Sequence, residues 1–183
     1  MPEVVGLGLT EGGSVFLASS SIIGSPIAEC ADDRLTASVL GGLWSQIADL
    51  RRARLAHRNL ALTNVLISND ESAWILDFDR AEVAASDRDL DRDVAELLVG
   101  LSVKVGVAAT VDSAVEVLGV EAVARTLPQL QPLALPPEIR SLAKRHKDLL
   151  KDLSAAIRDS TGAGEVELER LQRIKPRTIL MIV

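Results

Sequence analysis

The chain has little of several residue types that would point to particular classes of protein. Its 183 residues include one cysteine, two Trp, two Phe and no Tyr. Cys30 therefore cannot form an internal disulfide, and no cysteine-built metal site can exist, which suits a reducing cytoplasm. Because aromatic side chains are so few, the core must be built from Leu, Val, Ile and Ala.

Positive charge and long apolar runs are also scarce. The formal net charge is −6 with both signs interspersed, so no global field attracts nucleic acid or an anionic membrane. The N-terminus lacks the basic and apolar regions of a secretory signal, and no internal run reaches the roughly 18 apolar residues of a membrane span. The 48% hydrophobic content is ample for one compact domain. We therefore expect a cytoplasmic globule with no nucleic-acid partner.

The N-terminal part of the chain predicts a β-hairpin and then a long helix. Residues 3–18 contain two β-prone runs, and Glu11-Gly12-Gly13 between them supplies the positive-φ positions of a tight turn. A Gly/Pro/Ser connector follows at 19–29. Asp32 and Asp33 are N-cap candidates for a helix that ends near Arg54. Its apolar stripe, spaced by three or four residues, consists of Leu35, Val39, Leu43, Ile47 and Leu50.

The rest of the chain predicts a second hairpin and then only helices. Residues 64–68 and 73–77 are β-prone runs joined by a polar turn. His146 lies near a helical stripe and is expected in the core or at its boundary, because no second His or Cys lies at a metal-site spacing. This order predicts an α+β fold with most of its mass in helices. Helices are expected around 90–101, within 107–127, from 136 to 157 and at 165–174, with a flexible linker at 160–164.

Two polar residues bracket the second hairpin. Asn64 precedes its first strand and Asp77 ends its second, so both side chains should emerge at the same end of the hairpin. A carboxylate beside a side-chain amide is a donor set that Mg²⁺ accepts, with nucleotide phosphates completing the shell. The alternative is a helix-loop-hairpin in which the two residues only cap turns.

The segment around this hairpin resembles the protein-kinase and aminoglycoside-phosphotransferase superfamily. Residues 57–64 read HRNLALTN, similar to the catalytic loop H-[RG]-D-x-x-x-x-N, and residues 77–79 read DFD, similar to the metal-binding D-F-G or D-F-[DE] motif. The resemblance implies that Asn64 and Asp77 hold metal ions. Asp79, in place of the motif's glycine, is a third metal candidate. It also implies that His57 braces the loop and that Asp93 anchors the loop backbone.

Two departures from the family pattern argue against catalysis. Asn59 stands at the position of the catalytic base, and an amide can position a hydroxyl but cannot accept its proton. The 30 or so residues before the long helix contain no lysine, so the phosphate-clamping lysine is missing, and Gly6-Leu7-Gly8 does not match the glycine-rich loop. The second departure weighs more, because phosphoryl transfer depends mainly on positioning and charge.

The resemblance implies a mostly helical kinase-like C-lobe with two short β-hairpins and a largely missing N-lobe. Residues 1–30 would be the N-lobe remnant and hinge, and 31–159 the C-lobe. The nearest likeness is the kinase-like segment of some actinobacterial flippase-like or lysylphosphatidylglycerol-synthase-like membrane proteins. On that likeness, residues 165–183, a charged helix and the tail RIKPRTILMIV, would approach a membrane at the inner face of the plasma membrane. A hydrophobic tail of a soluble protein is the alternative.

Three functions follow from these observations. The leading hypothesis is a degenerate kinase-like (pseudokinase) binding or regulatory domain, cytoplasmic and attached to or partnered with a membrane protein or membrane surface. The alternative is a phosphotransferase that uses Mg and ATP on a small-molecule or lipid-linked hydroxyl, with Asp79 compensating for Asn59. A third is a structural module that forms a homo-oligomer through the open edge of the first hairpin.

Overall fold

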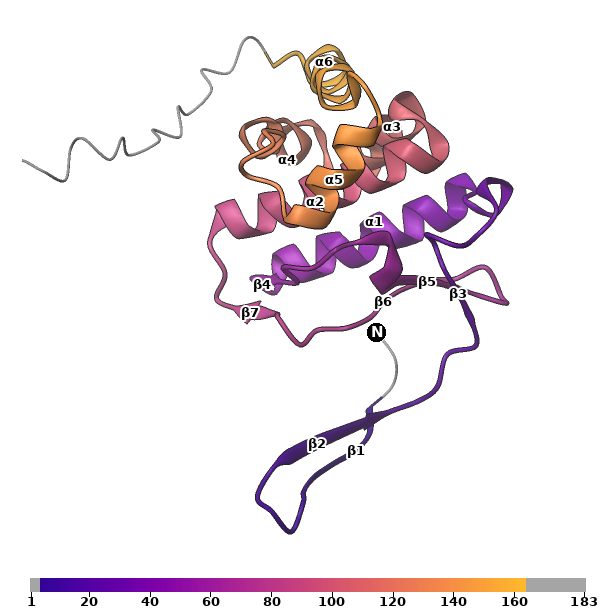
Figure 1. The fold of residues 1–183 in the computed structure, drawn as a ribbon, viewed down its shortest axis with the longest axis vertical. Coiled ribbons are helices and arrows are strands. Elements are labelled where there is room, and N and C mark those ends of the chain that lie inside the picture. The colour runs from indigo at the N-terminus through magenta and orange to yellow at the C-terminus, as the bar shows by residue number, and fades with distance from the viewer. Residues whose placement is uncertain (1–3, 164–183) are drawn as a thin grey trace, which may run out of the picture.

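The structure, a computed structural model, describes residues 4–163. It confirms the α+β class, because small antiparallel sheets lie beside a helical body (Figure 1). The expected final helix at 165–174 and the hydrophobic tail lie outside the described residues. The strands are β1 (Val4–Leu9), β2 (Val15–Ser19), β3 (Gly24–Pro26), β4 (Leu55–Ala56), β5 (Val65–Ser68), β6 (Ala73–Ile75) and β7 (Glu82–Val83). The helices are η1 (Asp32–Arg34), α1 (Ala37–Arg52), η2 (Leu62–Asn64), α2 (Asp87–Val105), α3 (Val107–Leu118), α4 (Val120–Ala124), η3 (Leu127–Gln129), α5 (Pro137–Arg145) and α6 (Leu149–Thr161).

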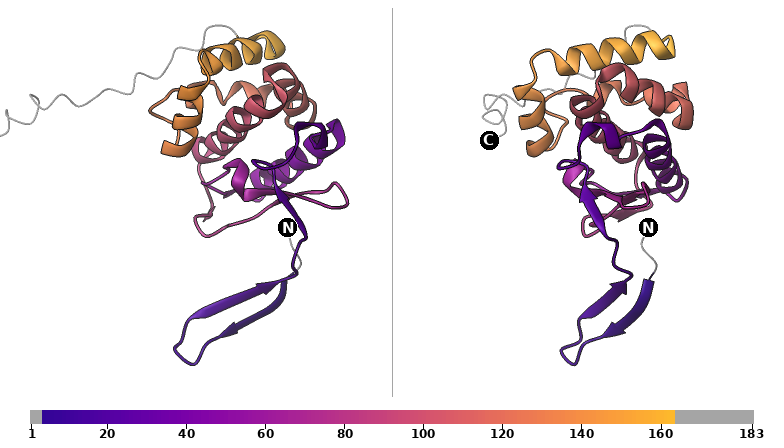
Figure 2. Two further views of the ribbon diagram at one scale, coloured as in Figure 1. Left: turned by 45° about the vertical axis from the view of Figure 1, so that its right-hand side comes forward. Right: turned by 90° about the vertical axis from the view of Figure 1, so that its right-hand side faces the viewer.

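Both expected hairpins are present. β1 pairs antiparallel with β2, with Gly13 at φ 80° in the turn. β5 pairs antiparallel with β6. The two hairpins differ in their surroundings, because β5 and β6 pack on the body whereas β1 and β2 project from it. The projecting hairpin lies at the end of the molecule opposite α6 (Figure 2).

The connector expected at 19–29 contains a strand that the sequence did not reveal. β3 pairs antiparallel with β5, with Gly24 opposite Ser68, so the central sheet has the order β3-β5-β6. A Cβ atom on Gly24 would lie 2.3 Å from the carbonyl oxygen of Ile67, so the two backbones can approach this closely only at a glycine. A three-residue strand is too short to show the alternating pattern by which strands are recognised.

Helix α1 begins at Ala37, so Asp32 and Asp33 are not its N-cap. Thr36 caps the helix, and its hydroxyl oxygen accepts a hydrogen bond from the Val39 amide at 3.3 Å. The two aspartates instead belong to the separate turn η1. The expected apolar stripe is buried in full, together with Leu40 and Trp44. Periodicity therefore located the helix. It could not identify the N-cap, which is the polar residue whose side chain reaches a free amide of the first turn.

The single helix expected from 136 to 157 is two helices. α5 ends at Arg145 and α6 begins at Leu149, with Asp148 between them at φ 62°. The buried residues of α5 are Ile139 and Ala143, and the next buried residue is Leu149. That step of six residues breaks the spacing of three or four that one helix requires. His146, in the turn, is exposed and does not belong to the core.

The linker expected at 160–164 is shorter than predicted. α6 continues through Thr161, and Gly162 ends it in the left-handed conformation at φ 65°. Glycine is the usual residue at such a helix end, because it has no Cβ to oppose a positive φ. Gly164 lies outside the described residues.

Helix α2 is the most deeply buried element of the body. Ser86 caps its first turn, and almost every residue from Leu90 to Ser102 is buried. It packs against α3, α5 and α6 and reaches β4 on the sheet side. Unlike an ordinary core helix, it carries acids on its buried surface, among them Asp93 and Glu96. These two carboxylates position the candidate site.

Candidate functional site

The loop that follows β4 brings three of the predicted site residues together. Leu76 donates its amide to the Asn64 carbonyl oxygen at 2.9 Å, which places Asn64 and Asp77 at the same end of the β5–β6 hairpin. The Asn64 side-chain amide donates to the carbonyl oxygen of Asn59 at 2.9 Å. The Asn59 amide in turn reaches an oxygen of Asp77 at 3.4 Å. Asn59, Asn64 and Asp77 therefore form one connected polar cluster at the solvent-accessible rim of the loop.

Asp93, on helix α2, holds the backbone at the start of this loop. Its two carboxylate oxygens accept hydrogen bonds from the backbone amides of His57 at 2.5 Å and Arg58 at 2.8 Å. The contact joins α2 to a loop 35 residues earlier in the chain. A carboxylate that satisfies two consecutive amides fixes both position and direction of the loop backbone. Asp93 therefore anchors the backbone at the start of the loop.

A second carboxylate supports the same loop and was missed in the sequence. Glu96, one turn after Asp93 on α2, accepts a hydrogen bond from the Leu60 amide at 3.1 Å. Its other carboxylate oxygen is buried with no hydrogen-bond partner among the described residues, and Arg92 Nε lies 3.6 Å from it. The sequence offered no signal for it, because helical periodicity places Glu96 on the side of α2 away from the apolar stripe, where an exposed glutamate is expected.

Burial sets the protonation of both anchor carboxylates. Burial and, after it, the neighbouring Asp93 charge raise the pKa of Glu96 to about 7, against the lowering effect of the Leu60 amide and Arg92. Burial also raises the pKa of Asp93, although the amides of Arg58 and His57 oppose the shift. Two carboxylates one turn apart in the core repel each other when both are ionised. The pair therefore favours one charge, and the amide hydrogen bonds favour keeping it on Asp93.

His57 connects the loop to the strand that ends at Asp77. The side chain is buried, and its Nε2 atom lies 2.8 Å from the carbonyl oxygen of Leu76. Because a carbonyl only accepts, Nε2 carries the proton. The ring also meets Phe78 edge to face, with centroids 4.6 Å apart. His57 therefore braces the loop against residues 76–78, and it is not placed to act on a bound ligand.

The backbone is strained at two residues of the site. Arg58 has φ 65° and Asp77 has φ 64°, both in the left-handed region that residues with a side chain seldom adopt. The Asp93 hydrogen bond holds Arg58, and a 2.6 Å ion pair with Glu82 holds its side chain. Such outliers cost free energy and are concentrated at functional sites. One of the two residues precedes Asn59 and the other is Asp77 itself. Four residues outside the cluster also have positive φ, so the conformation alone does not mark the cluster as functional: Arg54, Glu71, Ala84 and Asp148.

The predicted metal set is only partly assembled. Asn64 donates through its nitrogen, so its side-chain oxygen is available to a cation, and Asp77 offers the oxygen that Asn59 does not contact. Asp79 is exposed, and no hydrogen bond or ion pair joins it to the cluster within residues 4–163. Over the same residues, no group of three or more His, Cys, Asp or Glu side chains could hold a metal ion. Asn64 and Asp77 could therefore contribute two ligands, and a bound nucleotide or water would have to supply the rest.

Comparison with known proteins does not extend the assignment beyond the α+β fold. No family model matches the chain, and a search of curated proteins finds no match. In the described part of the chain, no helix is both long and apolar enough to cross a bilayer.

Proposed function

We propose that this chain is a degenerate kinase-like domain that binds a ligand or regulates a partner without transferring phosphate. The observation that carries the proposal is the contact at the base position. Asn59 has no basicity to offer, and its amide points at the Asp77 carboxylate, the strongest metal candidate. A binding domain would retain the hydrogen-bonded loop without a base at the position where phosphoryl transfer needs one.

The arrangement of the N-terminal residues supports the same proposal. The β1–β2 hairpin projects from the body and does not fold back over the loop (Figures 1 and 2). The first lysine of the sequence, Lys104, is on α2, where its ammonium group bonds the Cys30 carbonyl oxygen at 2.8 Å and Asp32 at 3.1 Å. It is therefore committed to the body and does not replace the missing phosphate clamp.

Thermal shift with Mg²⁺ and ATP tests the proposal. A degenerate domain is expected to show no nucleotide-dependent change in Tm, and Asn59→Asp is expected to gain no phosphotransfer, because the lysine and the covering loop are still absent. The alternative, a working Mg-dependent phosphotransferase, predicts a rise in Tm that Asp77→Asn abolishes. Asn is the right replacement because it tolerates the left-handed backbone at this position.

The matched control is Asp33→Asn, which removes the same charge from an exposed site on η1. A nucleotide-dependent rise in Tm that survives Asp33→Asn but disappears in Asp77→Asn would overturn the degenerate assignment. A rise that both variants keep would place nucleotide elsewhere on the chain and would equally contradict the loop as its site.

Self-association through the first hairpin is a second candidate function, favoured by a specific exposure. Val5, Leu7 and Leu9 alternate along β1 and are 65%, 70% and 70% exposed. β1 pairs only with β2 among the described residues, so its outer edge is open. An apolar face next to an open edge can pair with a second copy of the chain. Light scattering tests this directly, and a monomer at all concentrations would contradict it.

A further inference from the structure

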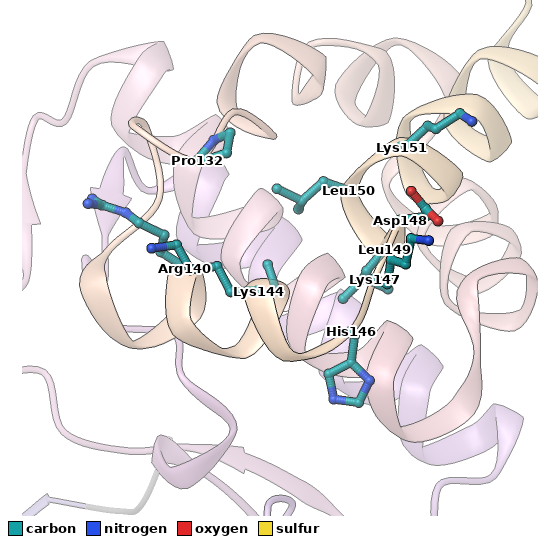
Figure 3. A pocket seen from close by; sticks show the side chains of 10 residues that line it. Pro132, Arg140, Lys144, His146, Lys147, Asp148, Leu149, Leu150 and Lys151 are labelled. Atoms are coloured by element: carbon teal, nitrogen blue, oxygen red, sulfur yellow. The ribbon is translucent and has the colours of Figure 1, made fainter.

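The turn between α5 and α6 gathers positive charge in a chain that is acidic overall. Residues 137–151 contain five Arg or Lys and two Asp or Glu, so this segment carries +3 while the whole chain carries −6. Four of these cations, Arg140, Lys144, Lys147 and Lys151, line a hollow of about 280 Å³ together with Pro132 and Leu150 (Figure 3). We call these four residues the α5–α6 basic face.

The cations of the basic face are not neutralised by acids of the described chain. None of the four forms a salt bridge within residues 4–163, whereas Arg51, Arg54 and Arg58 near the loop are each paired with an acid. Arg140 donates once, to the carbonyl oxygen of Leu135 at 2.9 Å, and its Nε is buried without a partner. The acid that lines the hollow, Asp148, is exposed and takes part in no salt bridge there. The positive charge is therefore available to something outside the described chain.

The spacing of these residues makes them a cost to the isolated domain. Arg140 and Lys144 are like charges four residues apart on α5, an arrangement that destabilises a helix. Lys147 and Lys151 flank the beginning of α6, where the helix dipole disfavours cations. Lys144 is in the last turn of α5, where the helix dipole favours a cation. Helix stability does not explain the repulsion between Arg140 and Lys144 or the position of Lys151 in the first turn of α6, so an anionic partner is the more economical reason for the clustering.

The shape of the face indicates which anion it fits. Figure 3 shows Arg140 and Lys144 on one side of the hollow and Lys147 and Lys151 on the other, with Leu150 between them. Cations that spread apart do not converge on one small phosphate. Apolar side chains lie among them, and Leu133, next to Pro132 in the chain, is 60% exposed. Separated cations around exposed apolar groups fit the headgroup region of an anionic bilayer better than a nucleic-acid backbone.

We propose that the α5–α6 basic face docks on an anionic phospholipid surface. It lies at the end of the molecule opposite the β1–β2 hairpin, so docking leaves the hairpin free (Figure 2). The proposal rests on charge and exposure alone and holds whether or not the loop binds nucleotide. It also differs from membrane contact through residues 165–183, because it assigns the contact to folded helices.

Co-sedimentation of the full chain with vesicles tests this surface. Wild-type protein is expected to sediment with phosphatidylcholine vesicles that contain about 30% phosphatidylglycerol, and not with phosphatidylcholine alone. Lys147→Glu/Lys151→Glu is expected to weaken vesicle binding at least tenfold, because each Lys or Arg close to an anionic surface adds to the free energy of binding. Raising salt from about 50 to about 300 mM should also release the wild type, since it shortens the screening length.

The matched control is Arg80→Glu/Arg88→Glu, the same change of charge at two exposed arginines that form no salt bridge within residues 4–163. Equal loss of binding in this control would show a general charge effect and overturn the proposal. Full binding by Lys147→Glu/Lys151→Glu would contradict the assignment of the contact to the α5–α6 basic face. Failure of the wild type to sediment, or tighter binding to a DNA duplex than to the vesicles, would also reject it. Circular dichroism of each variant verifies the fold.

Discussion

The sequence resemblance to kinases covers both the loop at residues 57–64 and the β1–β2 hairpin. The two segments differ in how they are attached to the body. The loop is held by amide hydrogen bonds to Asp93 and Glu96, two carboxylates in the centre of the body. The hairpin projects into solvent with an exposed apolar face on β1. The scaffold of the site therefore depends on α2, whereas we expect β1 and β2 to contribute little to the stability of the body.

Asp93→Ala is expected to have the largest effect on this contrast. Removing the carboxylate leaves the buried amide of His57 and the partly buried amide of Arg58 without acceptors, at a cost of about 3–4 kcal/mol in the free energy of unfolding. Asp112→Ala, on the exposed side of α3, is the control and should change stability by less than about 0.5 kcal/mol. Urea unfolding measures both. Equal stability of the two variants would show that the loop is not anchored through α2.

Glu96 should make stability depend on pH in a defined direction. Its pKa is about 7 in the folded protein against an ordinary 4.5, so the folded state binds the extra proton between these values. The contribution of Glu96 to the free energy of unfolding is therefore fully present below about pH 4.5. It is lost as pH rises through about 7, by at most about 3 kcal/mol. Glu96→Gln should lack this fall. The measurement is the difference in unfolding free energy between wild type and variant at about pH 5 and about pH 8.

Glu116→Gln serves as the control for this titration, because Glu116 is exposed on α3. A fall in stability from about pH 5 to about pH 8 that Glu116→Gln keeps and Glu96→Gln lacks supports the assignment. The acids with lowered pKa values, Asp70, Asp87 and Asp89, lose stabilising charge only below their ordinary range and do not disturb this window. A wild-type profile that rises from about pH 5 to about pH 8 relative to Glu96→Gln would contradict the assignment.

Gly24→Ala tests the boundary between the two regions. The added Cβ would meet the backbone of Ile67 at 2.3 Å and should separate β3 from β5, costing about 2 kcal/mol. Gly12→Ala makes the same substitution in the projecting hairpin, where the nearest atom is 3.9 Å away, and should be close to neutral. Thermal unfolding compares the two. A Gly12→Ala variant as unstable as Gly24→Ala would mean that the hairpin is part of the cooperative unit.

Leu7→Lys should have the smallest effect on stability. Leu7 is 70% exposed, so the substitution should change the free energy of unfolding by less than about 0.5 kcal/mol. If the hairpin mediates self-association, the same variant should shift the protein toward monomer in light scattering. Arg52→Glu, on the exposed end of α1, is the control for a general charge effect and should leave the oligomeric state unchanged.

The sequence predicted those parts of the site that depend on short distances along the chain. The motif spacing placed Asn59, Asn64 and Asp77 together, because one loop and one hairpin bring them there. It did not reveal Glu96, because Glu96 lies on the side of α2 away from the apolar stripe, and only the path of the loop decides whether that side is buried. Nor did it reveal β3, whose three residues are recognisable only through their pairing with β5.

The distribution of charge also separates what the sequence shows from what the fold decides. A net charge of −6 correctly describes the whole chain, but it gives no sign that the acids are paired near the loop and that cations are left unpaired on α5 and α6. Pairing depends on contacts between residues tens of positions apart, such as Arg51 with Asp91 at 2.8 Å. Composition averages over these contacts, so a local basic face appears only after folding.

The sequence by itself determined the α+β class, the presence of helices α1 and α2, both hairpins and the presence of an amide at the base position. These follow from residue periods and turn chemistry, which act over a few neighbouring residues. The tertiary structure decided that Asp93 and Glu96 hold the loop, that α5 and α6 are separate, and that their cations share one face. These depend on which distant groups are buried together, because burial sets the cost of an unpaired charge or amide.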